Sequence, residues 1–570
     1  MAGPVHYEVF ARKTPQSGWA LQLAAESRDQ AMQTAEDLLA DNRAVSVRVT
    51  KETLDVESME FQSITLMTKG APEPAKPKAA RDNQSLMVCN APQDLYAPHA
   101  RELIGRVLED WLGRNRLTPF ELLHRGDLVE ALEASGLELQ HAVQKVAVPE
   151  SQATGQPVHE IIRHYQKLVE KASERVIRAG RRQIFPDLEA EPVADVARRL
   201  SNTPDRAFLM GGAIAGAMAR ARGWRAKAEV LMNIADTAPE ETDPAALVHV
   251  AIEQAAGEIL GVREGLADVL GPSLDLGGQL AALVRMAAPQ EVDLLSRADA
   301  QFAAVIPTLD GPALRLGRHI AQGQYRVLAG GLSRRVLREL MGPRRLRPGD
   351  PSGEIDILRA LAMVLTAAAG RFLTLEEAQL AFAERSKAIV GADFVEAYVG
   401  SAATPLEEVN LLVRLCENVT GGSAKRSAAR WLSASVTALR FERSLRESDV
   451  GAGQRLATLA DLQSRVRACG LPERDSVEIC EALGRVGDAV EADGRVSAQV
   501  ARAPAPLGQR LALLLRMASG QTCPDGPAAD RAKGEALKLL RNTESRRLLS
   551  AEPQTLAALR PLMASAGLAA

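Results

Sequence analysis

The fold of this chain is decided by residues 95–180, which read LYAPHARELIGRVLEDWLGRNRLTPFELLHRGDLVEALEASGLELQHAVQKVAVPESQATGQPVHEIIRHYQKLVEKASERVIRAG. Apolar side chains recur here at the spacing of one helix face. The first stripe comprises Leu103, Ile104, Val107, Leu108, Trp111 and Leu112. The second comprises Val158, Ile161, Ile162, Tyr165, Leu168, Val169, Ala172 and Val176. The pattern predicts short antiparallel helices that bury these faces against one another.

Helix ends are marked in this stretch as clearly as helix faces. Thr118 and Glu121 have the spacing of a capping box, in which each side chain accepts a hydrogen bond from the other residue's backbone amide. Asp127 is expected to open the next helix, and Gly136 supplies its stop. A longer helix is predicted over residues 157–179.

Histidines are concentrated here, with five of the eight in the chain. His159 and His164 frame a sequence that resembles the zinc-binding HExxH pattern but has one residue too many. A zinc pair needs positions i and i+4, whereas i and i+5 point about 140° apart on a helix. We therefore expect no metal site. Because imidazole titrates near neutral pH, His124 and His164 remain candidates for ligand binding or pH sensing.

Composition limits both the core and the partners. The chain has 570 residues, of which only 3% are aromatic, so an aliphatic helical core is expected. Its formal net charge of -3 argues against nucleic acid or a membrane surface as the main partner. Five scattered cysteines and an N-terminus without an apolar segment favour a cytoplasmic protein. We find no nucleophile, metal or phosphate-loop motif, so we expect no cofactor, and an enzyme is disfavoured.

The first 70 residues differ from the rest of the chain. Strands are predicted over residues 5–12 and 18–24, followed by a helix that begins after Ser27. Val45, Val47 and Val49 alternate with polar residues, as in a half-buried strand, and residues 61–67 form a fourth strand. The segment is therefore expected to be a small ββαββ module.

Composition divides the residues after this module into a linker and several helical parts. The sequence GAPEPAKPKAARDNQS over residues 70–85 combines three prolines with few apolar side chains, which predicts a linker. We expect a mostly α-helical, repeat-like body of many helices, with helix in roughly two-thirds of all residues. The expected divisions are a ββαββ module over 1–70, a linker over 71–85, a helical domain over 86–180, a helical body over 181–420 and a C-terminal helical domain over 421–570.

Two short patterns stand out in the body. Gly212 and Gly216 form a GxxxG that no strand precedes, so it predicts close helix packing and not a dinucleotide site. Residues 276–287 and 507–518 align without gaps, with eight of the twelve positions identical. This match favours a duplication of residues 200–300 within 425–525, and chance in an alanine- and leucine-rich chain is the alternative.

Arginines form the clearest charge cluster, with only Glu339 nearby to offset them. Guanidinium groups suit carboxylates and phosphates, so the cluster is a candidate site for an anion or an acidic partner; the alternative is a solvated loop. The cluster comprises Arg334, Arg335, Arg338, Arg344, Arg345 and Arg347.

The function favoured by these patterns is that of a cytoplasmic scaffold or regulatory adaptor. A long helical body offers extended surfaces for protein partners, and a tethered N-terminal module adds a second binding element. The alternative is an enzyme or small-ligand sensor whose site lies in the histidine-rich residues 95–180. Association with nucleic acid through the arginine cluster is disfavoured by the near-neutral charge balance and the scarce aromatic residues.

Overall fold

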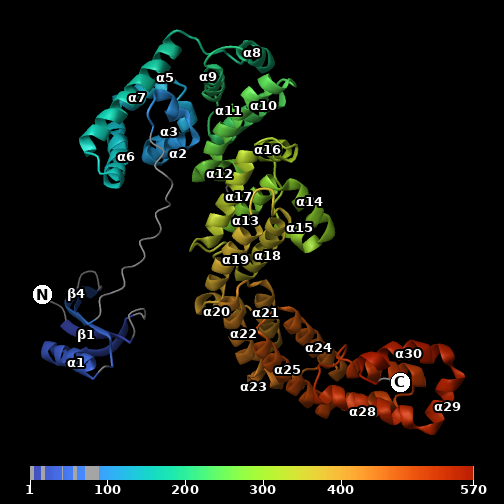
Figure 1. Cartoon of the computed structure of the whole chain (residues 1–570). Coiled ribbons are helices and arrows are strands. Elements are labelled where there is room, and N and C mark those ends of the chain that lie inside the picture. The colour runs from blue at the N-terminus through green and yellow to red at the C-terminus, as the bar shows by residue number, and fades with distance from the viewer. Residues whose placement is uncertain are drawn as a thin grey trace. The chain divides into compact units, whose positions relative to one another are not determined.

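The computed structural model describes residues 5–13, 19–41, 43–54, 61–70, 89–271 and 273–568 (Figure 1). Contacts divide the chain into two units, Met1–Val88 and Cys89–Ala570. The described residues contain 30 helices and one small sheet, and the chain is 72% helical. The predicted fold class, a mostly α-helical body after a small α+β module, is confirmed. The expected linker over residues 71–85 lies outside the described residues.

The N-terminal module has the predicted ββαββ order. Its elements are β1 (Val5–Arg12), β2 (Ala20–Ala25), α1 (Arg28–Ala40), β3 (Ser46–Leu54) and β4 (Phe61–Gly70). The strands are antiparallel in the order β2-β1-β3-β4. Ser27 caps α1 through the Gln30 amide, and the helix buries Ala31, Ala35 and Leu38 on the sheet. Alternation along β3 places Val47 and Val49 in the same core.

The second unit opens with short helices and one long one. These are the 3-10 turn η1 (Pro92–Tyr96), α2 (Pro98–Val107), α3 (Glu109–Asn115), α4 (Pro119–Leu122), α5 (Gly126–Ala134), α6 (Glu138–Thr154), α7 (Val158–Arg181), α8 (Val193–Leu200) and α9 (Arg206–Met218). Helices α5 and α6 both pack on α7. The capping box of Thr118 and Glu121 forms as predicted at the start of α4.

Several local predictions for this region need correction. The first apolar stripe does not lie on one helix, because the chain turns at Leu108 between α2 and α3. Helix α5 begins at Gly126, one residue before the predicted start, and Asp127 is not its cap. Within the two predicted stripes, Trp111 and Tyr165 are buried, whereas Leu103, Val107 and Ile162 are only half-buried.

The remaining helices complete the unit. They are α10 (Trp224–Asp236), α11 (Thr242–Gly261), α12 (Arg263–Leu270), α13 (Leu276–Ala287), α14 (Pro289–Ala298), α15 (Ala300–Val305), α16 (Gly311–Ala321), α17 (Arg326–Met341), α18 (Pro351–Ala367), α19 (Leu375–Ile389), α20 (Ala392–Val399), α21 (Pro405–Asn418), α22 (Gly422–Val436), α23 (Leu439–Arg446), α24 (Ala452–Ala468), α25 (Glu473–Gly494), α26 (Val496–Arg502), α27 (Leu507–Ala518), α28 (Pro527–Arg541), α29 (Thr543–Ala551) and α30 (Pro553–Ser565).

Helices of this unit pack mainly on near neighbours in the sequence. One row runs α11, α17, α19, α22, α25 and α28, each in contact with the next. A second row runs α13, α18, α21 and α24, and α27 contacts α30 beside it. Pairs such as α18 with α19, α21 with α22 and α24 with α25 join the rows, as Figure 1 shows. One aliphatic core continues through both rows.

Helix lengths from α18 to α29 follow a regular order. Two longer helices are followed by one short helix of seven to nine residues, four times in succession. The two copies of the sequence match are α13 and α27, helices with the same bounds as the match itself. Each follows a long helix of 20 or 22 residues and a short one of 8 or 7 residues.

Buried polar contacts tie α4 to the body. Lys227 of α10 lies 2.8 Å from a carboxylate oxygen of Glu121, and both side chains are almost fully buried. Lys227 also donates to the carbonyl of Arg116. Glu258 of α11 accepts a hydrogen bond of 2.6 Å from the Phe120 amide. Because a four-residue helix has too few internal hydrogen bonds to be stable alone, these contacts hold α4 in place.

Candidate functional site

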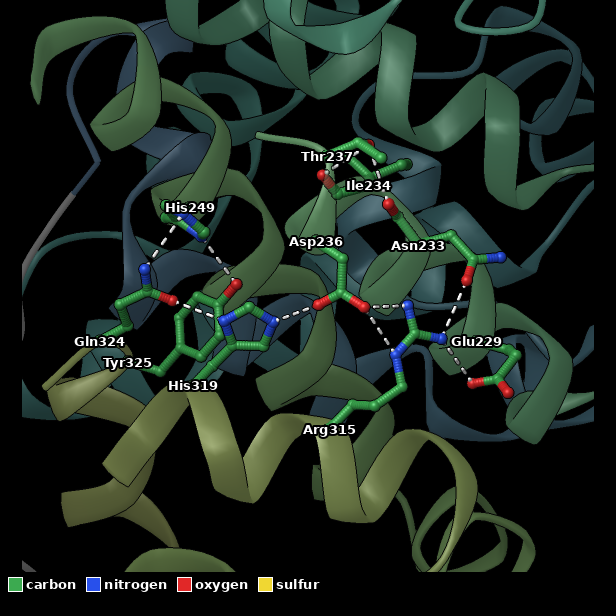
Figure 2. A network of polar contacts seen from close by, with 10 residues as sticks. All are labelled: Glu229, Asn233, Ile234, Asp236, Thr237, His249, Arg315, His319, Gln324 and Tyr325. Atoms are coloured by element: carbon green, nitrogen blue, oxygen red, sulfur yellow. Dashed lines mark hydrogen bonds and ion pairs between the residues drawn. The ribbon is translucent and has the colours of Figure 1, made fainter. Parts of the chain in front are cut away.

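A polar network joins α10, α11, α16 and α17 in the body (Figure 2). Arg315 and His319 lie one turn apart on α16, so both reach Asp236 at the end of α10. Arg315 donates to one carboxylate oxygen of Asp236 from Nε at 3.0 Å and from Nη2 at 2.6 Å. His319 Nε2 lies 2.8 Å from the other oxygen. Both carboxylate oxygens of Asp236 are therefore hydrogen-bonded.

The network continues on the far side of His319. Its Nδ1 atom lies 2.8 Å from the amide oxygen of Gln324. The amide nitrogen of Gln324 lies 3.4 Å from His249 Nε2, and His249 Nδ1 lies 2.8 Å from the Tyr325 hydroxyl. Figure 2 shows the resulting unbroken path from Asp236 to Tyr325. These residues come from segments far apart in the sequence, and their proximity depends on the packing of α16 against α10 and of α17 against α11.

Tyr325 has a backbone conformation that a bulky residue rarely adopts. Its φ of 52° lies in the left-handed region, at the residue before α17. Such a conformation costs about 1–2 kcal/mol for a residue other than glycine. It brings the buried ring within 5.5 Å of the His249 ring and 5.7 Å of the His319 ring, centroid to centroid. The Leu328 amide also donates to Glu253 at 2.9 Å, which fixes the first turn of α17 on α11.

Electrostatics differ along the path. Burial alone would raise the pKa of Asp236, but the hydrogen bonds from Arg315 and His319 outweigh it and hold that pKa below its usual range. Burial lowers the pKa of His249, and the neighbouring His319 lowers it further. Burial also raises the pKa of Tyr325, with the nearby carboxylates of Glu253 and Asp236 adding to the shift. Positive charge is therefore favoured at the Asp236 end of the path and disfavoured at His249.

Proton positions in the network are coupled. The Gln324 amide oxygen faces His319 Nδ1, and its amide nitrogen faces His249 Nε2. Turning the amide over would exchange the donor and acceptor roles that it offers to the two imidazole rings. The hydrogen-bond roles of His249 and His319 are therefore linked through Gln324.

The sequence-predicted histidines lie elsewhere and have structural contacts. His124 is buried against Tyr96 and Phe120, and its Nδ1 atom lies 2.7 Å from the Phe120 carbonyl. Burial lowers the pKa of His124 to about 4. His164 is half-buried, with Nε2 at 2.9 Å from the Cys89 carbonyl. The structure does not bring His124 and His164 into contact with each other.

His124 nevertheless borders a groove of about 500 Å³. The residues that line this groove include Phe185, Gly212 and Gly216, together with Arg125, Arg181 and other charged residues. Within the described part of the chain, no hydrogen-bond partner is found for Nε2 of His124. This nitrogen lies close to Gly211, where an added Cβ would come within 2.3 Å of it.

The arginine cluster divides into two sets. Arg335 donates to the carbonyl of Leu260 at the end of α11, and burial lowers the pKa of Arg335. Arg345 binds Glu354 at 2.8 Å, and Arg347 lies 3.2 Å from Asp275. Arg334, Arg338 and Arg344 are exposed, and no ion pair is recorded for them with any described residue. The structure therefore uses half of the cluster for internal contacts.

In the portion that the structure describes, no cluster of three or more His, Cys, Asp or Glu side chains could hold a metal ion. The same portion has no single helix long and apolar enough to cross a membrane. Helices α11 and α12 would be long and apolar enough together, but the chain bends by 101° between them.

Sequence reasoning missed the network of Figure 2. Arg315 and His319 lie four positions apart, which shows that they share a helix face. The sequence around them does not indicate their partner, Asp236. No family model, no curated protein and no solved structure matches the chain.

Proposed function

We propose that this chain is a cytoplasmic helical interaction protein, a scaffold or regulatory adaptor, with a tethered N-terminal binding module. The observation that carries the proposal is the pair of helix rows, in which each helix contacts the next one in its row. Stacked helices of this kind are typical of solenoid proteins, which bind partners along an extended surface. The five cysteines, all unpaired and buried, support a reducing compartment.

The regular order of helix lengths supports a repeat-like body. A unit of two longer helices and one short helix cannot bury its own apolar faces, so stacked copies share one core. The sequence match fits this pattern, because α13 and α27 each follow a long and a short helix. We infer that the body grew by duplication of a helical unit. The N-terminal module would then add a second contact at high effective concentration.

Affinity capture of the tagged full chain from native lysate, followed by quantitative mass spectrometry, tests the proposal. We expect at least one protein in near-stoichiometric amount that resists a wash at about 0.15 M salt, where exposed charges more than about 8 Å apart are largely screened. A chain that recovers no stoichiometric protein over a range of salt concentrations would contradict an interaction role.

A second candidate function, a small-ligand sensor, is favoured by the groove beside His124. Neutral His124 would accept a hydrogen bond at Nε2 from a ligand N–H or O–H group. A thermal-shift screen of metabolites with the full chain would test this. We expect a stabilising compound whose effect is lost in His124→Ala and kept in His164→Ala, because His164 does not line the groove. Equal loss in both variants would exclude the groove.

A further inference from the structure

Helix α17 has an outward stripe that combines cationic and apolar side chains. Its exposed residues include Val327, Arg334, Arg338 and Met341, spaced by seven, four and three residues and therefore on one face. Val327 is 73% exposed and Met341 is 48% exposed. Between them, a side chain added at Gly331 would meet no atom within 4 Å. The stripe is an open strip about 21 Å long, at about 1.5 Å per residue.

The positive charge of this stripe is not neutralised by nearby acids. Glu339 is the only acidic residue of α17, and it lies beside Arg335. Two acids on nearby helices have other partners. Glu253 accepts the Leu328 amide, and Glu354 binds Arg345 and the Leu346 amide. Arg334 and Arg338 thus differ from arginines such as Arg315, Arg414 and Arg465, which pair with carboxylates.

We propose that this stripe binds an acidic amphipathic helix of a partner protein. Two carboxylates one turn apart on that helix would pair with Arg334 and Arg338, whose guanidinium groups suit carboxylates. Apolar side chains on either side of those carboxylates would cover Val327 and Met341. A phosphate polymer would leave both apolar ends uncovered, and the net charge of -3 opposes its approach. The inference rests on the proposed interaction function and names its partner class.

A defined peptide tests the proposal directly. The probe is a fluorescein-labelled synthetic helix of about five turns, with two glutamates at i and i+4 between leucines. Its binding to the full chain is followed by fluorescence anisotropy at about 0.15 M salt. We expect the Arg334→Glu/Arg338→Glu chain to bind about tenfold more weakly. Val327→Ser should also weaken binding, although it leaves the charge unchanged.

The matched control is Arg426→Glu/Arg430→Glu on α22. These arginines are also exposed, one turn apart and without a recorded ion pair to a described residue. Equal weakening in the control would show non-specific attraction and overturn the proposal, as would equal binding of a scrambled peptide of the same composition. Tighter binding of a DNA duplex or of phosphatidylserine vesicles would assign the stripe to phosphates. The variant Arg334→Gln/Arg338→Gln removes both charges without reversing them. If its melting temperature is unchanged, weaker peptide binding cannot be attributed to misfolding.

Two results separate this inference from the wider function. Suppose that the peptide does not bind the unaltered chain and that the Arg334→Glu/Arg338→Glu chain still captures its full set of partners from lysate. The proposal that the stripe binds an acidic helix is then wrong, and the interaction role stands. If the unaltered chain captures no protein, the interaction role fails whatever the peptide does. Sedimentation of the full chain adds a third outcome. Self-association that Arg334→Glu/Arg338→Glu abolishes would mean that the occupant is a second copy of this chain.

Discussion

Buried charges in the helical body occur beside specific partners. Lys227 and Glu121 form an ion pair that is almost fully excluded from water, and Thr118 donates to the same carboxylate. Removing one member of such a pair costs more than the pair contributes, because the other charge stays buried without its partner. The chain places this pair where α4 meets the body. Single residues therefore decide how firmly the short N-terminal helices of the unit are held.

Lys227→Met should destabilise the body by about 3–5 kcal/mol. The substitution leaves the buried Glu121 carboxylate with only its Thr118 contacts. Urea unfolding followed by circular dichroism measures the loss. The double variant Lys227→Met/Glu121→Gln should recover part of the stability, since it no longer buries a charge. A single variant within about 1 kcal/mol of the unaltered chain would show that water reaches this pair.

Glu258 predicts a dependence of stability on pH. Only 15% of its side chain is exposed, and burial raises its pKa to about 7 even though Arg101 lies nearby. The unfolded value is about 4.3. A raised carboxyl pKa contributes stability that is complete below the unfolded value and lost as pH rises through 7. Relative to Glu258→Gln, the unaltered chain should lose on the order of 2 kcal/mol between pH 5 and pH 8.

The melting temperatures of the two chains, compared across that pH range, check this expectation. Their difference should change with pH in one direction only: the melting temperature of the unaltered chain should fall relative to that of Glu258→Gln as pH rises. A constant difference would mean that Glu258 stays ionised throughout.

Asp236 should behave in the opposite way. Its lowered pKa means that the carboxylate contributes stability above the unfolded value of about 3.9 and loses it as pH falls through the folded value. Asp236→Asn should cost about 1–2 kcal/mol at pH 6, because it removes the charged hydrogen bonds to Arg315 and His319. Chemical denaturation at several pH values should show this cost shrinking as pH falls below the unfolded value and through the folded one. Asp310→Asn, at a far more exposed ion pair, is the control and should have little effect.

Several helices in this chain begin at capping residues, whereas how closely they pack depends on small residues such as glycine. Thr374 and Thr404 cap α19 and α21 as their sequences indicate. The GxxxG of α9, by contrast, has two unlike glycines. A Cβ added at Gly212 would lie 1.9 Å from the Phe185 ring, whereas one at Gly216 would meet nothing within 4 Å. Of the two glycines of the motif, only Gly212 is closely packed, and its neighbour Gly211 also lies tightly against His124.

Gly212→Ala and Gly216→Ala form a matched pair on one helix. Gly212→Ala should destabilise the body by about 1–3 kcal/mol, because the added methyl group clashes with Phe185. Gly216→Ala should be neutral or stabilising by up to about 1 kcal/mol, since alanine favours the helix. Thermal unfolding of both variants measures the contrast. Equal effects would mean that Phe185 moves aside without cost.

At the scale of the whole molecule, two units with different construction are joined by residues whose composition predicts a tether. The ββαββ module has its own small core, and the helical unit continues one core through two rows of helices. Contacts between residues place the boundary between the two units at Val88 and Cys89. Residues 71–85 lie outside the described residues, so the prediction for them rests on the sequence.

Limited trypsin digestion of the native chain should cut first at Lys78 or Arg81. The segment offers almost no apolar side chains, so burial cannot offset an ordering cost of about 1–2 kcal/mol per residue. Lys76 is protected because proline follows it. Mass spectrometry should find a fragment of roughly 80 residues beside a stable body. First cuts within residues 100–180 would show that the division between the units is misplaced.

The fold class could be predicted from the sequence, because helix faces and caps are local signals. The capping box at Thr118 needs only residues within one turn and was predicted correctly. The stripe of α7 was predicted in part: Ile161, Tyr165, Leu168, Ala172 and Val176 are buried, whereas Val158 is exposed. The arginine cluster was visible as a run of charge, but which of its members face solvent was not. That depends on whether Glu354, Asp275 and the end of α11 come within reach.

The candidate site could not be predicted from the sequence, because it depends on how the helices pack. Asp236, His249, His319 and Tyr325 lie on separate segments and carry no local motif. They meet because α16 packs on α10 and α17 packs on α11, which is a consequence of apolar burial elsewhere on those helices. Burial is non-directional, so it can be anticipated from a periodic pattern. A hydrogen bond depends on distance and angle, and those are set only after the helices have packed.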